Sequence, residues 1–188
     1  MTVVASNYAR AENDLYQTEP WATEALLRNF PVKGLFTWEP AAGNHMMADV
    51  LNEHGAAVFT SDIATYDKQH DETLDFLDKS FCPKMAIDAL ITNPPYGKGN
   101  RDAVKFAELA LQRCSGLVAL LLTAKFDFGK TRRHLFADNP RFIAKINLVD
   151  RIQWFAGAMT GTEDHAWYVW GAAPLIPVKP VILYEGKQ

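Results

Sequence analysis

Short apolar stretches alternate with amphipathic stretches along most of the chain. Apolar residues three and four positions apart predict helices at 19–29, 45–54, 102–114 and 131–137. Thr18 is expected to be the N-cap of the first of these helices, with Pro20 in its first turn. Runs rich in branched and aromatic residues predict strands at 35–39, 57–62, 85–92, 116–122, 143–149, 166–171 and 181–184. The run at 116–122 is almost continuously apolar, which is typical of a central parallel strand covered on both faces. This alternation predicts an α/β protein with a doubly wound sheet.

Length and composition indicate one globular domain. A chain of 188 residues is long enough for a substantial core, and residues 1–12 lack any pattern and are expected to be mobile. No apolar run is long enough to span a membrane, and no signal peptide is visible. Cys82 and Cys114 are far apart, so we expect reduced, buried thiols in a cytoplasmic protein. The five histidines lack ligand spacing, so we expect them on the surface or on helix faces, with no metal.

The strand predicted at 85–92 runs directly into Asn93, Pro94, Pro95 and Tyr96. Proline lacks the N–H that a sheet ladder needs, so the strand must end there. A polar amide and an aromatic ring are therefore held on a stiff loop at the carboxyl end of a strand. In open α/β sheets that edge is where ligands bind. The simpler alternative is a proline-terminated strand with an incidental Asn and Tyr.

A turn of small residues follows the strand at 35–39. Glu39 ends that strand, and the turn consists of Pro40, Ala41, Ala42, Gly43 and Asn44. Small side chains let a ligand approach the backbone, and the helix that follows presents free N–H groups. The Glu39 carboxylate can accept a hydrogen bond from the amino group or the ribose of a ligand. A plain strand–turn–helix connection is the alternative, because the turn is not the GxGxxG pattern.

A second acid, Asp62, ends the strand at 57–62. It lies about twenty residues after the glycine turn, where dinucleotide-binding folds place a ribose-binding acid. Ile63 follows it and can cover a base. The alternative role of Asp62 is that of a helix or turn cap.

Charge is distributed unevenly along the sequence. The net charge is −3, yet residues 125–151 hold seven basic residues against three acidic ones. A local basic segment in an acidic protein is consistent with a phosphate-binding face or with a solvated helix. The candidate phosphate contacts in this segment are Lys125, Lys130, Arg132 and Arg133.

Together these motifs resemble the amino-methylating, S-adenosylmethionine-dependent methyltransferases, specifically the adenine-N6 DNA group. The stretch 93–96 matches the family's catalytic Asn-Pro-Pro-Tyr without change, and 39–44 resembles its Asp/Glu-Pro-x-x-Gly cofactor loop. Tyr16 and Thr18 resemble the N-terminal cofactor motif, although the family usually has Thr and Pro adjacent. The residues that fall where the ribose and adenine contacts would be are Asp62, Ile63, Asp75 and Phe76.

The resemblance implies a class I methyltransferase fold, Rossmann-like and mostly parallel, with an antiparallel strand near the C-terminus. It implies S-adenosylmethionine as cofactor and DNA as partner. The Asn93 side-chain oxygen and the Pro94 carbonyl would accept hydrogen bonds from the two N–H groups of the target amine. Tyr96 would stack on a flipped base, where stacking contributes roughly 1–3 kcal/mol.

Family members that read a DNA sequence usually carry a separate target-recognition domain, and we expect none here, as in compact phage-type members. Base recognition would then come from loops at 97–101, which contains Lys98, and at 126–133, or from a second subunit. RNA-base methylation is the main alternative, because Asn-Pro-Pro-Tyr is shared with enzymes of that class. Glutamine methylation and a non-catalytic cofactor-binding module are further alternatives.

Overall fold

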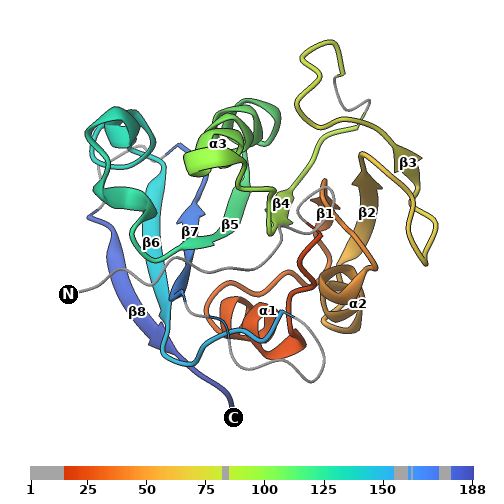
Figure 1. The fold of residues 1–188 in the computed structure, drawn as a ribbon, viewed down its shortest axis with the longest axis horizontal. Coiled ribbons are helices and arrows are strands. Elements are labelled where there is room, and N and C mark those ends of the chain that lie inside the picture. Colours follow the sequence, from red (N-terminus) through yellow and green to blue (C-terminus); the bar gives the residue numbers. More distant parts are fainter. Residues whose placement is uncertain (1–14, 82–84, 155–160, 162, 174–178) are drawn as a thin grey trace.

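The computed structural model describes residues 15–81, 85–154, 161, 163–173 and 179–188 (Figure 1). Within these residues eight strands form one sheet in the order β3-β2-β1-β4-β5-β7-β6-β8. β7 runs antiparallel to both β5 and β6, and the other neighbouring strands are parallel. The predicted α/β class is confirmed, as is a mostly parallel sheet with an antiparallel strand near the C-terminus. The predicted mobility of residues 1–12 and the burial of Cys82 lie outside the described residues.

The strands agree with the sequence pattern apart from β4 and β3. β4 begins four residues later than predicted, after Asp88, whose side chain accepts a hydrogen bond from the Phe36 backbone N–H at 2.9 Å. β3 was not predicted, because two exposed polar residues carry no strand signal. The bounds are β1 Phe36–Glu39, β2 Ala57–Asp62, β3 Glu72–Thr73, β4 Ala89–Thr92, β5 Leu117–Thr123, β6 Phe142–Leu148, β7 His165–Trp170 and β8 Val181–Glu185.

α1 and α2 are shorter than the sequence pattern suggests, α3 has the predicted length but begins one residue earlier, and the helix predicted at 131–137 is a 3-10 helix. They are α1 Pro20–Leu27, α2 Met46–Glu53, α3 Arg101–Arg113 and the 3-10 helices η2 Lys98–Asn100, η3 Phe126–Phe128 and η4 Lys130–Leu135. The expected cap of α1 at Thr18 is wrong. Glu19 is the N-cap, without a side-chain capping bond, while Thr18 is buried. None of these helices is both long and apolar enough to span a membrane.

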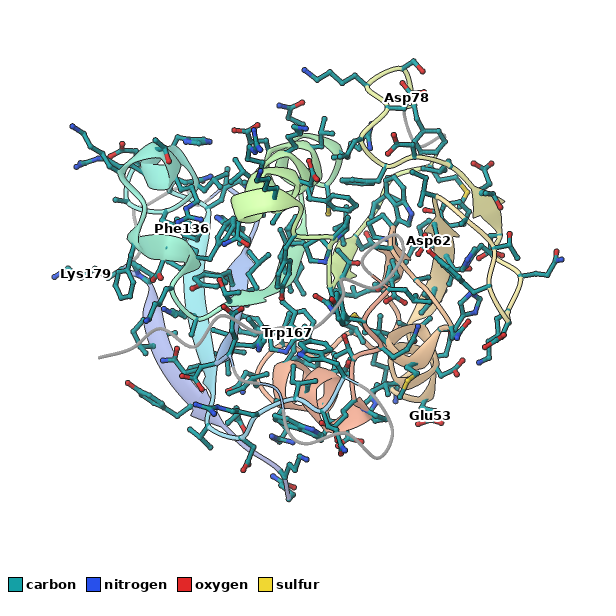
Figure 2. All side chains as sticks on the ribbon, in the orientation of Figure 1. Glu53, Asp62, Asp78, Phe136, Trp167 and Lys179 are labelled. Carbon is teal, nitrogen blue, oxygen red and sulfur yellow. The ribbon has the colours of Figure 1, made fainter. Side chains whose placement is uncertain are left out.

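Two apolar layers enclose the sheet (Figures 1 and 2). α1 and α2 pack on one face, and α3 with η4 packs on the other. The two tryptophans of β7 show how both faces are closed. Trp167 donates its indole N–H to the Ala22 carbonyl in α1 at 2.6 Å, and Trp170 donates to the Leu135 carbonyl in η4 at 2.7 Å. Their burial therefore leaves no indole N–H unsatisfied. Cys114 is a buried free thiol, as predicted.

Several strands of the sheet end at the same edge, which we call the carboxyl edge. The parallel strands β1, β2, β4 and β5 all finish there. Because β7 is reversed, its first residue, His165, pairs with Thr123, the last residue of β5. Side chains from both halves of the sequence therefore meet at this carboxyl edge.

Candidate functional site

A cavity of about 410 Å³ lies at the carboxyl edge, beside the ends of β1, β2 and β4. Pro95 lines it, whereas Pro94 and Tyr96 of the same tetrapeptide are not among its lining residues. The structure brings together around this cavity every residue that the sequence indicated for a cofactor: Tyr16, Thr18, Glu39, Pro40, Ala41, Ala42, Gly43, Asp62, Ile63, Asp75, Phe76 and Asn93.

The turn after β1 is bonded to the end of β2. The Gly43 backbone N–H donates to Oδ2 of Asp62 at 2.9 Å, and the Ala42 N–H donates to the Ser61 carbonyl at 3.1 Å. Gly43 has φ +50°, a left-handed conformation that favours glycine. A Cβ there would lie 2.8 Å from Nε2 of Gln17 and 2.9 Å from Cδ1 of Leu15. The turn therefore favours glycine for its conformation, and a larger residue there would displace the side-chain ends of Gln17 and Leu15, which line the cavity.

Glu39 is a buried carboxyl group beside this turn. Its side chain is 2% exposed, and its Oε2 has no hydrogen-bond partner among the described residues. Burial, and then the negative charge of Asp62, raise the pKa of Glu39 well above the usual 4.5, while a backbone hydrogen bond from Ala48 opposes this. A buried acceptor without a partner is costly, so Oε2 indicates a position where a ligand donor fits.

The segment between β2 and β3 forms a further wall of the cavity. Asn44 exchanges two hydrogen bonds with Asp67, at 2.9 and 3.0 Å, and Nε2 of His45 lies 2.8 Å from Nδ1 of His70. Tyr66 from this segment lines the cavity, and Ile63 is 56% exposed at its border. These contacts join the segment between β2 and β3 to the start of α2, and the sequence pattern did not indicate the residues that make them.

Phe76 is held rigidly in the opposite wall. Its ring stacks on Phe106 at 4.4 Å, and the Arg113 guanidinium lies 4.6 Å from its centroid. Arg113 also donates to the Phe76 carbonyl and, at 2.6 Å, to the Asp78 carbonyl. Asp75 accepts a hydrogen bond from the Leu77 N–H at 2.8 Å. The backbone around Phe76 is therefore fixed by α3.

The side-chain amide of Asn93 is oriented by Tyr16. Nδ2 of Asn93 donates to the Tyr16 carbonyl at 3.3 Å. An amide nitrogen that faces a carbonyl turns the amide oxygen, Oδ1, the other way. No hydrogen bond to Oδ1 occurs among the described residues. Nearby, the Tyr96 hydroxyl donates to the Leu121 carbonyl at 3.2 Å, which anchors this ring to β5.

Four rings form an arc beside Asn93. Tyr96 stacks on His165 at 6.2 Å, His165 meets Trp154 edge-on at 5.0 Å, and Trp154 meets Tyr16 at 5.9 Å. His165 is 4% exposed, and burial lowers its pKa to about 4. The expectation that each histidine lies on the surface or on a helix face is wrong for His165. Its position at the start of an apolar strand was the available sequence signal.

The predicted basic residues lie outside the cavity lining. Lys98, Lys125 and Lys130 are exposed. The Arg132 guanidinium lies 4.5 Å from the Phe126 ring centroid, and Arg133 pairs with Asp138 at 2.8 Å. Among the described residues no group of three or more potential metal ligands occurs.

No protein-family model and no curated protein matches the sequence. Solved structures are similar in fold. A Pyrococcus horikoshii protein with a proposed RNA methyltransferase activity matches with TM-score 0.68 and 15% identity, over 89% of this chain and 92% of that one. The methyltransferase subunit of a type I restriction-modification system from Streptococcus thermophilus matches with TM-score 0.64 and 13% identity, over 85% and 45% of the two chains.

A Listeria monocytogenes protein with a proposed class I S-adenosylmethionine-dependent methyltransferase activity matches with TM-score 0.58 and 12% identity, over 89% of this chain and 62% of that one. At these identities the likeness shows the fold, which is that of the class I methyltransferases. The chain spans less than half the length of the restriction-modification subunit and most of the Pyrococcus protein.

Proposed function

We propose that the protein transfers a methyl group from S-adenosylmethionine to the N6 amine of adenine in DNA, in the manner of the compact phage-type enzymes that it resembles. The observation that carries the proposal is the position of Asn93. It lines the same cavity as Gly43 and Asp62, and its amide nitrogen is engaged by Tyr16. An oriented acceptor oxygen thus stands beside a nucleotide-sized cavity.

The cavity suits S-adenosylmethionine in size and chemistry. Its volume of about 410 Å³ lies in the range of small-ligand sites, and the Gly43 turn allows close approach to the backbone. Glu39 Oε2 would accept a hydrogen bond from the cofactor's ammonium group, and Asp62 would accept from the ribose hydroxyls. Ile63 and Phe76 would enclose the adenine. When bound, the cofactor supplies a methyl group activated by its sulfonium.

The chain's own residues would prepare the target amine. An aromatic amine is a poor nucleophile because its lone pair is delocalised into the ring. Asn93 Oδ1 and the Pro94 carbonyl would accept hydrogen bonds from its two N–H groups, which localises the lone pair and directs it at the cavity. As the N–C bond forms and the cofactor's S–C bond breaks, the methylated amine would release one proton to water. Tyr96, anchored through its hydroxyl to Leu121, would support the face of the base. Alignment and fixed dipoles, rather than a strong base, would lower the barrier.

DNA is the preferred substrate because the tetrapeptide and the Glu-Pro cofactor loop resemble the DNA adenine group. The fold likeness to a restriction-modification subunit is consistent with this. RNA methylation is the second candidate, favoured by the likeness that covers 92% of the Pyrococcus protein. For either polymer, Lys98, Lys125, Lys130, Arg132 and Arg133 would contact phosphates.

Transfer of a labelled methyl group from S-adenosylmethionine to DNA, RNA and protein tests the proposal. Asn93→Ala is expected to reduce transfer by roughly 100-fold or more, because it removes an acceptor used in the transition state. Its cofactor affinity, measured by calorimetry, should remain close to wild type. Asn52→Ala, an exposed position on α2, is the matched control.

Each alternative has its own outcome in this experiment. Transfer to RNA alone would favour the second candidate, and transfer to protein alone would favour glutamine methylation. Cofactor binding without transfer to any substrate would favour a non-catalytic module. Near wild-type turnover of Asn93→Ala would refute the assigned role of Asn93, and no binding at millimolar cofactor would refute the cofactor assignment.

A further inference from the structure

Two histidines join one wall of the cavity to the start of α2. Residues 63–71, which we call the strap, connect β2 to β3 (Figure 1). Ile63 and Tyr66 of the strap line the cavity. Nε2 of His45, the residue before α2, lies 2.8 Å from Nδ1 of His70 in the strap. The proposed methyl transfer gives neither histidine a role.

The hydrogen bonds of the pair determine which ring nitrogens carry protons when both histidines are neutral. Nε2 of His70 lies 3.1 Å from the Ala64 carbonyl, which can only accept, so this nitrogen is the donor. Nδ1 of His70 then has no proton and accepts the hydrogen bond from Nε2 of His45. The bond survives one protonation of the pair. After a second protonation no acceptor is left between the rings, and two positive charges repel each other.

Other titratable groups surround this pair. They are Asp49 of α2 and, in the strap, Tyr66, Asp67, Lys68 and Asp71. Lys68 pairs with Asp49, Asp67 exchanges hydrogen bonds with Asn44, and Asp71 accepts from the Thr60 N–H and hydroxyl. Among these residue types only histidine has an ordinary pKa near neutrality. The contact between His45 and His70 is therefore the part of this network that mild acid changes.

The environment of His45 disfavours its protonation while the strap is in place. Burial, and then the charges of His70 and Lys68, lower the pKa of His45 below the usual 6.5, whereas Asp49 and Asp71 oppose this. A pKa that is lower with the strap in place than with the strap released favours the bound strap above pH 6.5. This preference is lost as the pH falls through the lowered pKa.

We propose that His45 and His70 form a latch that holds the strap against α2, so that the protein binds S-adenosylmethionine at neutral pH and releases it in mild acid. The identity of the ligand rests on the proposed function. Both histidines are positioning residues that act through the strap. The rings of Tyr66 and His70 meet edge-on at 6.4 Å, so the latch supports a side chain of the cavity wall. A strap that is already in place loses little conformational entropy when the cofactor binds.

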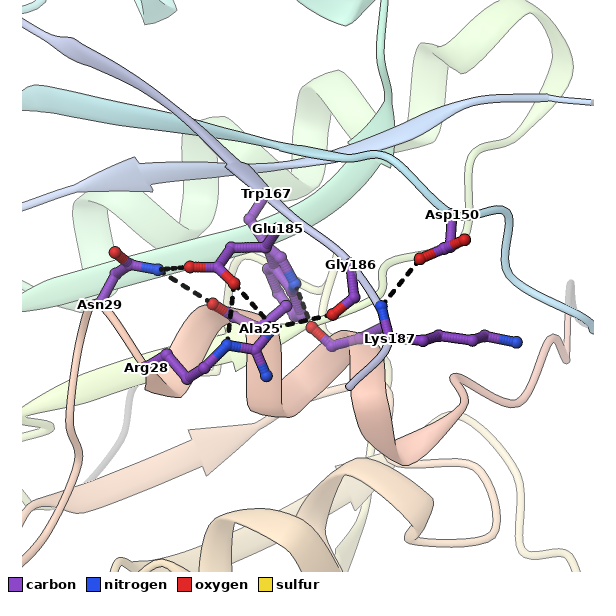
Figure 3. A network of polar contacts seen from close by, with 9 residues as sticks. Ala25, Arg28, Asn29, Asp150, Trp167, Glu185, Gly186 and Lys187 are labelled. Carbon is purple, nitrogen blue, oxygen red and sulfur yellow. Dashed lines mark hydrogen bonds and ion pairs between the residues drawn. The ribbon is translucent and has the colours of Figure 1, made fainter.

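A second contact between distant segments provides an internal reference. Glu185, at the end of β8, accepts hydrogen bonds from Nδ2 of Asn29 and Nε of Arg28, both at 2.8 Å (Figure 3). These hydrogen bonds lower the pKa of Glu185 below its usual 4.5. Arginine stays protonated at all relevant pH values. The contact between β8 and α1 should therefore not change between about pH 5.5 and 7.

Hydrogen exchange without cofactor tests the latch directly. Protection factors, which exclude the intrinsic effect of pH on exchange, should fall roughly tenfold for residues 64–71 between about pH 7 and 5.5. Those of residues 181–185 should stay constant. In His45→Gln the fall should vanish, because the glutamine amide can donate the same hydrogen bond and does not titrate. His54→Gln, at an exposed histidine that ends α2, should behave like the wild type.

Calorimetry over the same pH range connects the latch to the cofactor. Wild-type affinity for S-adenosylmethionine should fall roughly tenfold towards acid, and His45→Gln should lack the part due to the latch. Glu39 is retained in both proteins, so its own titration cancels from the comparison. His45→Ala should bind more weakly than His45→Gln at pH 7. Both variants place a side chain at the same left-handed φ of +66°, and they differ in the donor. Thermal melts check that each variant is folded.

The two measurements separate the latch from the proposed function. No cofactor binding by the wild type would refute the cofactor assignment, and hydrogen exchange would still decide whether the latch exists. Protection of residues 64–71 that is constant with pH in the wild type, or that falls equally in His45→Gln, overturns the latch. Equal pH dependence of cofactor affinity in the wild type and His45→Gln, or equal affinity of His45→Ala and His45→Gln at pH 7, overturns its effect on the cofactor.

Discussion

The backbone N–H of Gly43 donates to Oδ2 of Asp62 at 2.9 Å, in a buried hydrogen bond that joins the turn after β1 to the last residue of β2. The bond holds one carboxylate oxygen against the turn and so fixes the direction of the other, Oδ1. Oδ1 lies 3.4 Å from the Ala64 N–H, a long contact that leaves acceptor capacity. Asp62 is therefore oriented before any ligand arrives, which reduces the entropic cost of binding.

Gly43→Ala is expected to impair cofactor binding beyond its effect on stability. The left-handed φ costs an alanine about 1–2 kcal/mol, and the new Cβ would push aside the side-chain ends of Gln17 and Leu15, two residues of the cavity lining. Gly34→Ala is the matched control, because Gly34 has φ +80° and no atom near the position of its Cβ. Both variants should be destabilised in thermal melts. By calorimetry, Gly43→Ala alone should lose roughly tenfold or more in S-adenosylmethionine affinity. Equal affinity of the two variants would contradict this.

Glu39→Gln should raise stability and lower cofactor affinity. Burial, and then Asp62, raise the pKa of Glu39 in the folded protein. Its contribution is therefore fully present below the unfolded pKa and is lost as pH rises through the folded pKa. Without cofactor, Glu39→Gln should not show this loss, so it should unfold at higher denaturant than wild type at pH 8. Its affinity for S-adenosylmethionine should be lower, since an amide cannot match a carboxylate against an ammonium. Parallel pH curves for both proteins would argue against a raised pKa.

His165 should make the folded protein sensitive to acid. Burial lowers its pKa from 6.5 to about 4, so protonation opposes folding. The stabilisation is complete above pH 6.5 and is lost as pH falls through 4, amounting to about 3 kcal/mol. Urea unfolding of His165→Phe should lack this component. His134→Phe changes an exposed histidine and serves as the control. An unchanged acid dependence in His165→Phe would exclude His165 as its source.

Lys125 and Lys130 are the clearest test of the nucleic-acid face, because Arg132 packs on Phe126 and Arg133 is paired with Asp138. Replacing both lysines with alanine should weaken DNA binding. The double substitution should also reduce the slope of log binding constant against log salt concentration, by about 0.7–0.9 for each phosphate that the variant no longer neutralises. The exposed pair Lys33 and Lys79 provides a variant of equal charge change. Identical salt slopes for the two double variants would favour a solvated segment.

The cavity was predictable because its residues sit at strand ends. β2 was predicted with its observed bounds, since an apolar run ends at a charged residue, Asp62. Glu39 and Asn93 follow the same rule at β1 and β4, and parallel strand ends share an edge. The sequence pattern therefore located the residues without showing their contacts.

Contacts between distant segments were not predictable. The arc from Tyr96 to Tyr16 depends on β7 lying between β5 and β6, and no periodicity encodes that order. The count of charges indicated the basic segment but could not show that Arg133 pairs with Asp138. The prediction of Thr18 as the N-cap of α1 was wrong, because the Thr18 side chain is buried in the tertiary structure and this outweighed its local preference for a cap.

The reversal of β7 also has a consequence for how such proteins diversify. The connection between Leu148 and His165 begins and ends at the carboxyl edge of the sheet, and His165 at its second end stacks beside Tyr96. Residues added to this connection would reach an incoming target while the strands on either side kept their register. If the proposed function holds, the length of this one connection could change which targets fit without disturbing the cavity or its acids.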